Sequence, residues 1–265
     1  MRKIGQGDKS EVFALPEGGI LKLFFPHYAT LAPVEHDVSR ALVAAGVPAP
    51  RVERLLEVDG RPGLVFSDLP EGETLSHAVR GRPWAFLTAA RDLAELHAAV
   101  HERSSAALPS QRERLESEIR ESDAVTDGAR QAALAALDGL PDGTAVCHMD
   151  VHMLNVIVHP AGSVLIDWVR AVRGNPLADV ATAVLQLRFG EYPRGLAARG
   201  ALAMGRAVFW RTYLRRYLEL RSLDAASVAG WELPVAVGLA GRRAGRMRAQ
   251  LQHRIGTLLA GRWAA

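Results

Sequence analysis

The sequence predicts an α+β protein with a small β-rich N-terminal lobe that contains one main helix, and a larger, mostly α-helical C-terminal lobe. Short apolar segments separated by glycine and proline turns fill the first seventy residues, as in a small sheet. From residue 83 onward apolar residues recur at helical spacing, and the polar segment 67–73 separates the two patterns. A chain of 265 residues can form two packed units, so we expect an N-terminal lobe over 1–68 and a C-terminal lobe over 69–265.

The N-terminal lobe is expected to contain short strands and one helix. Strands are predicted at 4–7, 11–15, 20–25, 51–58 and 64–66. The dipeptide Asp59-Gly60, between the last two strands, is typical of a tight β-hairpin. A helix is predicted over 33–45, because apolar residues recur there at helical spacing until Gly46 and Pro48.

The C-terminal lobe is expected to be helical around one strand pair. Helices are predicted over 83–100, twice between 110 and 137, and over 197–221 and 234–260. Another helix begins at Pro176, because Asn175 is a good N-cap and proline suits the first helical position. The strand pair is predicted at 155–158 and 164–166.

Composition excludes several classes of protein. Hydrophobic residues make up 49% and charged residues 23%, as in ordinary globular proteins. The sequence has no uncharged apolar run near the ~20 residues of a membrane helix, no secretory apolar region follows the basic start, and one cysteine excludes a disulfide framework. We therefore expect a cytoplasmic protein with no membrane partner, as a monomer or weak dimer.

The basic residues are unevenly distributed. Only three of the 32 are lysine, and residues 201–265 carry eleven arginines against Glu219, Asp224 and Glu232. Such a face could bind nucleic acid or an anionic ligand, but it is more often a solvated helix surface. A nucleic-acid partner is therefore not expected.

A glycine-containing motif lies near the N-terminus. Residues 5–12 match G-x-G-x-x-G-x-V through Gly5, Gly7 and Val12, with Ser10 in the last glycine position. Glycines let backbone N–H groups approach phosphate oxygens closely, although a plain hairpin turn explains the motif equally well. No helix follows directly, which argues against a dinucleotide-binding fold.

Lys22 is unusual because it interrupts an apolar strand in a chain that otherwise prefers arginine. It is either a solvated strand residue or the partner of Glu35, thirteen residues later in the next helix. A strand lysine paired with a helix glutamate is the arrangement that holds nucleotide phosphates in protein kinases.

The densest cluster of reactive residues lies at 147–155. Asp150 and Asn155 form D-x-x-x-x-N, and Asp167 follows at the end of an apolar strand. Phosphoryl transfer needs a carboxylate to accept the hydroxyl proton and oxygen ligands for Mg²⁺, which these residues supply. A zinc site made from His148, Asp150 and His152 is the alternative, but it lacks a clear further ligand. Asp179, read alone, is a favourable charge at a helix N-terminus.

These motifs occur in a familiar order: His148-x-Asp150-x-His152-x-x-Asn155, then Ile166-Asp167-Trp168, then Asn175-Pro176 and Asp179-Val180-Ala181. From Gly5 to about Leu187 the chain resembles the aminoglycoside phosphotransferase family. Members of that family are kinase-like enzymes that phosphorylate hydroxyl groups of small molecules. The resemblance implies a protein-kinase-like bilobal fold.

The resemblance also implies roles for individual residues. Asp150 would be the catalytic base, and Asn155 and Asp167 the Mg²⁺ ligands. The nucleotide would be bound by Gly5, Gly7, Ser10, Lys22 and Glu35, with an adenine-binding hinge at Phe66, Ser67, Asp68 and Leu69. His148 would anchor the catalytic loop and Asp179 would brace it. Met149 and Met153 depart from the family pattern, which usually has glycine and commonly has proline at these positions.

We expect an ATP- or GTP- and Mg²⁺-dependent phosphotransferase that acts on a hydroxyl of a small molecule. An aminoglycoside or similar antibiotic is the favoured acceptor. Such a polycation would need carboxylates, for which Glu191 and Glu232 are candidates. The alternatives are a kinase of a sugar, amino sugar or choline-like metabolite, and a nucleotide-binding pseudokinase or interaction module.

Overall fold

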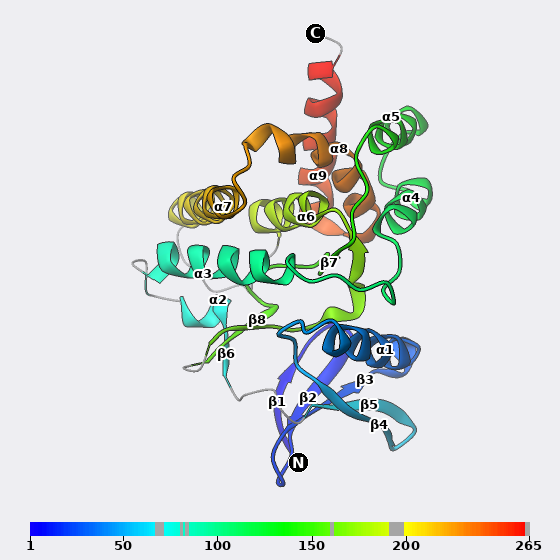
Figure 1. Ribbon diagram of the computed structural model, residues 1–265, viewed down its shortest axis with the longest axis vertical. Helices are drawn as coiled ribbons and strands as arrows, with labels where there is room; N and C mark the ends of the chain where they lie inside the picture. The colour runs from blue at the N-terminus through cyan, green and yellow to red at the C-terminus, as the bar shows by residue number, and fades with distance from the viewer. Residues whose placement is uncertain (67–71, 80–81, 83–84, 160–161, 191–198, 263–265) are drawn as a thin grey trace.

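The computed structural model describes residues 1–66, 72–79, 82, 85–159, 162–190 and 199–262. Figure 1 shows a β-rich part at one end of the molecule and helices at the other. The two-part α+β architecture predicted from the sequence is therefore confirmed. The predicted lobe boundary at 68–69 falls among residues outside those described.

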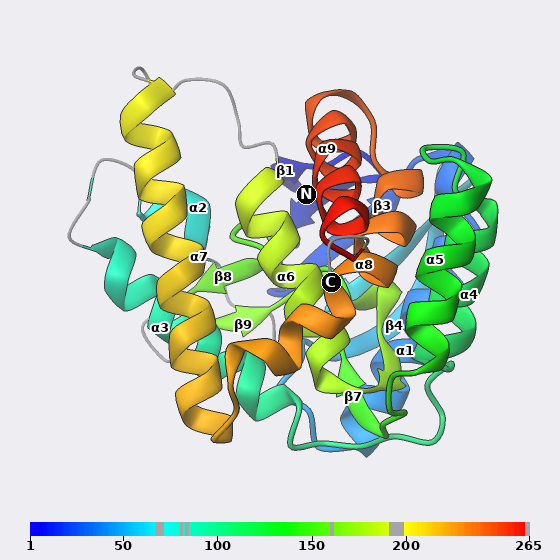
Figure 2. The same ribbon diagram turned by 90° about the horizontal axis from the view of Figure 1, so that it is seen from above.

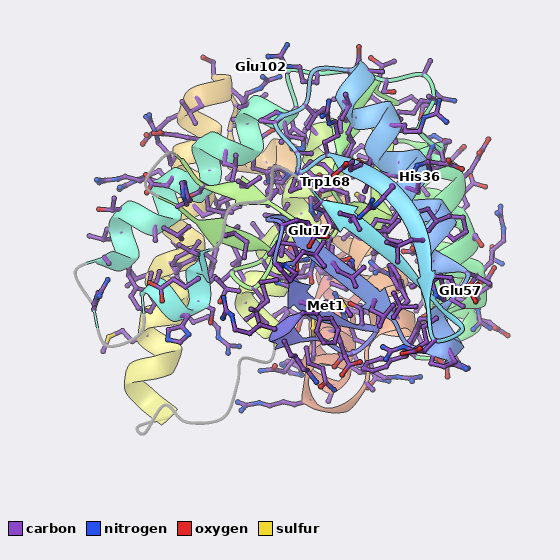
Figure 3. The ribbon with its side chains drawn as sticks, turned by 90° about the horizontal axis from the view of Figure 1, so that it is seen from below. Met1, Glu17, His36, Glu57, Glu102 and Trp168 are labelled. Carbon is purple, nitrogen blue, oxygen red and sulfur yellow. The ribbon has the colours of Figure 1, made fainter. Side chains whose placement is uncertain are left out.

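The N-terminal part is a five-stranded antiparallel sheet in the order β1-β2-β3-β5-β4. Its strands are β1 Arg2–Gln6, β2 Ser10–Ala14, β3 Ile20–Phe24, β4 Val52–Val58 and β5 Arg61–Phe66. Asp59 and Gly60 both have positive φ, 50° and 74°, as the tight hairpin predicted between β4 and β5 requires. Figure 3 views the molecule from this end, where Glu57 lies near the tip of the hairpin.

Strand β3 is buried on both faces. Ile20 and Phe24 pack into one apolar cluster, while Leu21 and Leu23 pack into another. Helix α1 (Leu31–Ala44) lies against the sheet, and its Ala32 joins the first cluster. Lys22 is thus fixed at the centre of a rigid element, next to the helix that carries Glu35.

The C-terminal part is built from packed helices. Its helices are α2 Leu75–Ala78, α3 Ala85–Val100, α4 Gln111–Glu121, α5 Asp127–Asp138, α6 Pro176–Phe189, α7 Arg199–Arg221, α8 Ala225–Arg242 and α9 Gly245–Arg262. Figure 2 shows α3 beside α7 on one flank and α4 beside α5 on the other, with α6, α8 and α9 between them. No helix in the described ranges is long and apolar enough to cross a membrane.

The C-terminal part also contains short strands, most of which lie between α5 and α6. They are β6 Glu73–Thr74, β7 Ala145–Cys147, β8 Val156–Val158, β9 Val164–Leu165 and β10 Val172–Gly174. The predicted pair β8–β9 is confirmed, and β6 pairs with β8 while β7 pairs with β10. Strands β6, β7 and β10 were not expected, because two or three residues are too few to show a period.

The single helix predicted over 234–260 is wrong. The chain forms α8 and α9, separated where Arg243 is extended (φ −112°, ψ 159°) and Gly245 has φ +58°. Helix α8 begins nine residues before Pro234, because Asp224 caps it by accepting a hydrogen bond from Ser227 N. The prediction took Pro234 for a helix start, whereas it lies inside α8.

Candidate active site

A cleft of about 1020 Å³ lies between the two parts of the molecule. Its walls come from the loop after β1, strand β3, helix α1, the loop between β7 and β8, and the turn between α8 and α9. Most sequence-predicted site residues of the described ranges line it: Gly5, Gly7, Ser10, Lys22, Glu35, Phe66, Asp150, Asn155 and Asp167.

Lys22 joins the two parts through a buried cluster of charges. Its Nζ lies 2.7 Å from Glu35 Oε2 and 2.8 Å from Asp167 Oδ1. The side chains of Lys22 and Glu35 are only 15% and 4% exposed, so Lys22 is not the solvated strand residue that the sequence left open.

Burial opposes charge in this cluster. It would lower the pKa of Lys22, but Glu35 and Asp167 raise that pKa well above its ordinary value. Burial raises the pKa of Glu35, while Lys22 outweighs burial at Asp167 and lowers its pKa. Lys22 is therefore a permanent cation, and Asp167 an anion at neutral pH.

The loop after β7 carries Asp150 and Asn155. Asn155 Nδ2 donates to the backbone oxygen of Asp150 at 2.9 Å, which closes the loop, and both residues are 7% exposed. Ile166 N donates to Asn155 O at 2.9 Å, so the β8–β9 hairpin returns the chain to this loop just before Asp167. One chain segment thus gathers three oxygen-bearing side chains at the cleft.

Two residues of the site have left-handed backbones. Met149 has φ 61° and Asp167 has φ 63°, a conformation that costs a non-glycine residue about 1–2 kcal/mol. His148 stabilises the second position, because its Nε2 lies 3.0 Å from Ile166 O and its ring lies 4.4 Å from that of Trp168.

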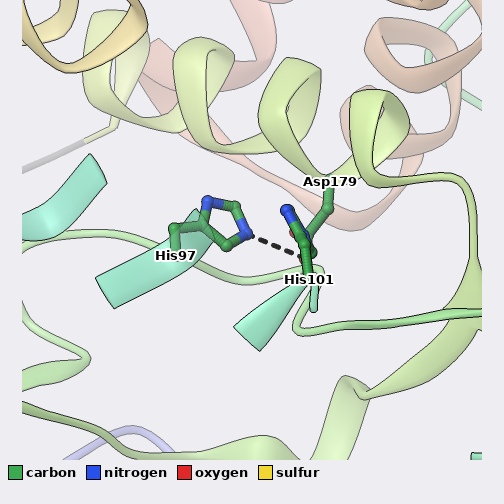
Figure 4. Close-up of side chains that lie close together, drawn as sticks. All are labelled: His97, His101 and Asp179. Atoms are coloured by element: carbon green, nitrogen blue, oxygen red, sulfur yellow. Dashed lines mark hydrogen bonds and ion pairs between the residues drawn. The ribbon is translucent and has the colours of Figure 1, made fainter. Parts of the chain in front are cut away.

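Asp179 holds the loop from below, inside the helical part. Its carboxylate accepts hydrogen bonds from the backbone N of His148 at 2.5 Å and of Met149 at 2.8 Å. His97 and His101 point toward it from the C-terminal part of α3 and just beyond (Figure 4), with Nε2 atoms 3.1 and 3.3 Å from Oδ2. Asp179 is therefore more than a favourable charge at a helix N-terminus.

The titration of this buried cluster follows from its contacts. Burial alone would raise the pKa of Asp179, but His97 and His101 together lower it well below its usual range. Burial, with His97 beside it, lowers the pKa of His101 to about 4. The two rings also bond outward, from Nδ1 to Tyr213 OH at 2.6 Å and Tyr217 OH at 2.7 Å.

The zinc alternative receives no support from this geometry. Within the described part of the chain, the potential ligand atoms that approach within 4.8 Å of one another belong to His97, His101 and Asp179. His148 points to Ile166 O, and His152 Nε2 lies 3.8 Å from Asp150 Oδ2. The three residues His148, Asp150 and His152 do not form a cation site here.

Several expected site residues lie elsewhere or outside the described ranges. Ser67, Asp68, Leu69 and Glu191 are not among the described residues. Glu232 is not among the residues that line the cleft. It accepts hydrogen bonds from Arg254 at 2.6 Å and from Arg188 at 3.1 Å. Its charge is therefore already paired within the protein.

Comparison with known protein families identifies the family of this chain. The phosphotransferase enzyme family, APH, matches residues 2–220, most of the chain. The chain belongs to this family. It is therefore an enzyme of the phosphotransferase class.

Solved structures share the fold of this phosphotransferase at low sequence identity. A thermostable mutant of aminoglycoside phosphotransferase APH(4)-Ia, in a ternary complex with AMP-PNP and hygromycin B, is 16% identical, with a TM-score of 0.65 over 97% of this chain and 92% of that one. The amicoumacin kinase hAmiN, in complex with AMP-PNP, Ca²⁺ and Ami, is 14% identical, with a TM-score of 0.62 over 96% and 86%. APH(3'')-Id from Streptomyces rimosus is 19% identical, with a TM-score of 0.57 over 89% and 92%. No curated protein sequence matches the chain.

Sequence reasoning missed two cleft residues of the phosphotransferase that contact each other, Arg243 and Gln186. Arg243, at the end of α8, donates through Nη2 to Asp150 Oδ1 at 2.8 Å and to Gln186 Oε1 at 2.6 Å. The contacts bridge 93 and 57 positions of sequence, and Arg243 is one of many arginines in its region. No sequence signal marked Arg243, because it lies inside the single helix predicted over 234–260.

Proposed function

We propose that this phosphotransferase transfers the γ-phosphoryl group of ATP, or GTP, to a hydroxyl group of a small molecule, with Mg²⁺ as the metal. The observation that carries the proposal is the buried set of Lys22, Glu35 and Asp167 in one cleft with Asp150 and Asn155. A paired lysine, a metal-binding carboxylate and a nearby base are the parts that phosphoryl transfer requires.

The proposed reaction uses each group once. The acceptor hydroxyl gives its proton to Asp150 as its oxygen forms a bond to the γ-phosphorus. The bond from the γ-phosphorus to the bridging oxygen breaks, and its electron pair leaves with the nucleoside diphosphate. Lys22, held by Glu35, would bind phosphate oxygens throughout.

The metal ligands would be Asn155 and Asp167. Asn155 donates through its amide nitrogen to Asp150, which leaves its amide oxygen as the atom that can bind a cation. An amide oxygen and a carboxylate are hard ligands of the kind that Mg²⁺ prefers. When bound, the ion would neutralise charge on the transferred phosphoryl group.

The loop after β1 suits a phosphate group. Gly7 N donates to Ser10 O at 2.9 Å, so the loop forms a tight turn over the cleft. A Cβ atom at Gly7 would contact no protein atom within 4 Å, so packing within the protein does not explain the glycine. Close approach of a phosphate does explain it. The nucleotide-bound complexes of the structural neighbours support the same interpretation.

The alternatives are weaker. A pseudokinase typically lacks the base or a metal ligand, and Asp150, Asn155 and Asp167 are all present. Several C-terminal arginines are engaged in ion pairs within the protein, including Arg216 with Glu95 and Arg248 with Asp123, which weakens a nucleic-acid interpretation. An antibiotic, such as an aminoglycoside, and a sugar-like metabolite remain the candidate acceptors.

Two variants test the proposed function. Asp167→Ala should abolish the Mg²⁺-dependent binding of AMP-PNP in titration calorimetry, because a metal ligand is lost. Asp150→Ala should bind AMP-PNP like the wild type but lose about 10²–10⁴-fold in kcat, as expected for removal of a general base. Turnover would be measured as ADP release across aminoglycosides, macrolides, peptide antibiotics, sugars and small alcohols. Binding and turnover at wild-type levels in Asp167→Ala would refute the proposal.

Asp123→Asn is the matched control. Asp123 lies on the surface in an ion pair with Arg248, and its side chain is 74% exposed. This variant should bind AMP-PNP and turn over nucleotide like the wild type.

A further inference from the structure

The helical wall of the cleft presents positive charge next to the proposed base. Arg243 contacts Asp150 directly, and Arg242 lines the cleft beside it. His152 lies on the other side of the same carboxylate, with 3.8 Å between its Nε2 and Asp150 Oδ2. An acceptor whose hydroxyl reaches Asp150 would therefore meet these side chains first.

The carboxylates of this wall are already committed. Among the described lining residues of the helical part, the acidic side chains are Asp150 and Asp167, which the proposed function assigns to the base and the metal. Glu118 lies behind Arg242, 3.1 Å from its Nε, and also pairs with Arg170. Glu232 is paired with Arg188 and Arg254. No described carboxylate on this wall is left for a cationic acceptor.

Hydrogen-bond donors are in excess at the same place. Gln186 is 3% exposed, and its Nε2 has no partner among the residues that the structure describes. The Nε atom of Arg243 is likewise buried without a partner in the described ranges. Both side chains line the cleft, and buried donors without acceptors destabilise a site. A group rich in acceptor oxygens would balance the site better than another cation.

We propose that the acceptor molecule carries an anionic group, a carboxylate or a phosphate, which binds Arg243 and draws it away from Asp150. The inference rests on the proposed function and deepens it by assigning the charge of the acceptor. Arginine suits this role, because its planar guanidinium binds carboxylate and phosphate groups through two hydrogen bonds.

Binding of such an acceptor would also activate the base. While Arg243 donates to Asp150 Oδ1, that carboxylate oxygen is occupied and is less available to an acceptor hydroxyl. An anion that takes the guanidinium would leave both carboxylate oxygens of Asp150 free of Arg243 and open to the acceptor hydroxyl. Selection of the acceptor and readiness of the base would then be one event.

A matched series of sugars tests the inference. Glucuronate, glucose 6-phosphate, glucose and glucosamine share one ring, so they differ chiefly in charge, and hygromycin B supplies a polycation. Each is titrated into the protein saturated with Mg²⁺ and AMP-PNP, and each is assayed with ATP for product formation by mass spectrometry. The carboxylate and the phosphate arms distinguish the two sources of anion.

In the wild type, at least one anionic sugar should bind about tenfold more tightly than glucose or glucosamine. Arg243→Ala should raise the Kd and KM of that anion about tenfold, while the Kd of AMP-PNP changes by less than about threefold. Arg248→Ala, which removes an arginine from the same region away from the cleft, should leave the preference intact.

Three outcomes would overturn the inference: tighter binding of glucosamine or hygromycin B than of both anions, an anion preference that survives Arg243→Ala, or no saturable binding of either anion below about 10 mM. In each case Mg²⁺-dependent AMP-PNP binding that is lost in Asp167→Ala would leave the proposed function standing. If the wild type itself showed no Mg²⁺-dependent binding of AMP-PNP, the proposed function would be refuted.

Discussion

Replacing Asp179 with asparagine should destabilise the loop that carries Asp150. Asp179 is fully buried, and its carboxylate accepts from two backbone N–H groups, at His148 and Met149, while two histidine rings approach it. Asparagine has nearly the same shape, but it has one acceptor oxygen in place of two and carries no charge. Its NH₂ group would face donors wherever it points.

The magnitude follows from the contacts. One backbone N–H left without an acceptor costs about 1–3 kcal/mol, and loss of hydrogen bonds to a charged group costs about 1.5–3 kcal/mol. Together these contributions are about 2.5–6 kcal/mol. The usual cost of removing one partner of a buried ion pair, about 3–5 kcal/mol, lies within that range and is the value we expect. For a chain of this size the melting temperature should fall by roughly 6–20 °C.

Urea unfolding of wild type and Asp179→Asn at pH 7.5, followed by tryptophan fluorescence, measures the change. Asp123→Asn is the control, because its exposed ion pair with Arg248 should contribute no more than about 1 kcal/mol. Turnover should also fall, since the loop that carries Asp150 loses its anchor. A free energy of unfolding within about 1 kcal/mol of the wild type would show that Asp179 does not brace the loop.

Three further predictions concern single positions. Met149→Gly should relieve left-handed strain of about 1–2 kcal/mol but lose a buried side chain worth about 2–5 kcal/mol, so urea unfolding should show net destabilisation. Stabilisation would contradict this balance. In the folded protein His101 has a pKa of about 4, against an ordinary value of 6.5. As the pH falls from 6.5 to 4, the unfolded chain therefore takes up a proton at His101 that the folded protein does not, and the free energy of unfolding should fall by about 3 kcal/mol. In His101→Gln the curve over this range should be flatter, and an equally steep curve would exclude His101 as the cause. Lys22→Arg should remain folded but lose most turnover, because a planar guanidinium does not fit between Glu35, Asp167 and phosphate; wild-type turnover would refute this role.

Much of the fold could be predicted because its causes are local. The Asp59-Gly60 hairpin follows from two residues that tolerate positive φ, and helix α6 begins where Asn175 caps Pro176. The apolar run around Lys22 predicted a strand, and the structure shows that this strand is buried on both faces. The spacing of Asp150 and Asn155 also predicted their grouping, because the six residues from one to the other form one closed loop.

Sequence patterns failed where the signal was short or ambiguous. Strands β7 and β10 have three residues each, and each is stabilised by pairing with the other. One precedes and the other follows the chain segment that carries Asp150, Asn155 and Asp167. The break between α8 and α9 depends on one extended residue, Arg243, and one left-handed glycine, Gly245. A pattern of apolar residues runs through such a break without change.

The sequence by itself determined the two-part architecture, the reactive residue types and their order along the chain. Only the tertiary structure decided which of many arginines contacts Asp150 and that Glu232 is paired with arginines. It also decided that Asp179 holds the loop through the backbone N–H groups of His148 and Met149. The physical reason is separation along the chain. Turns, caps and strand periods depend on neighbours within a few residues, whereas the charge of the cleft wall depends on which distant side chains folding brings within 3 Å of Asp150.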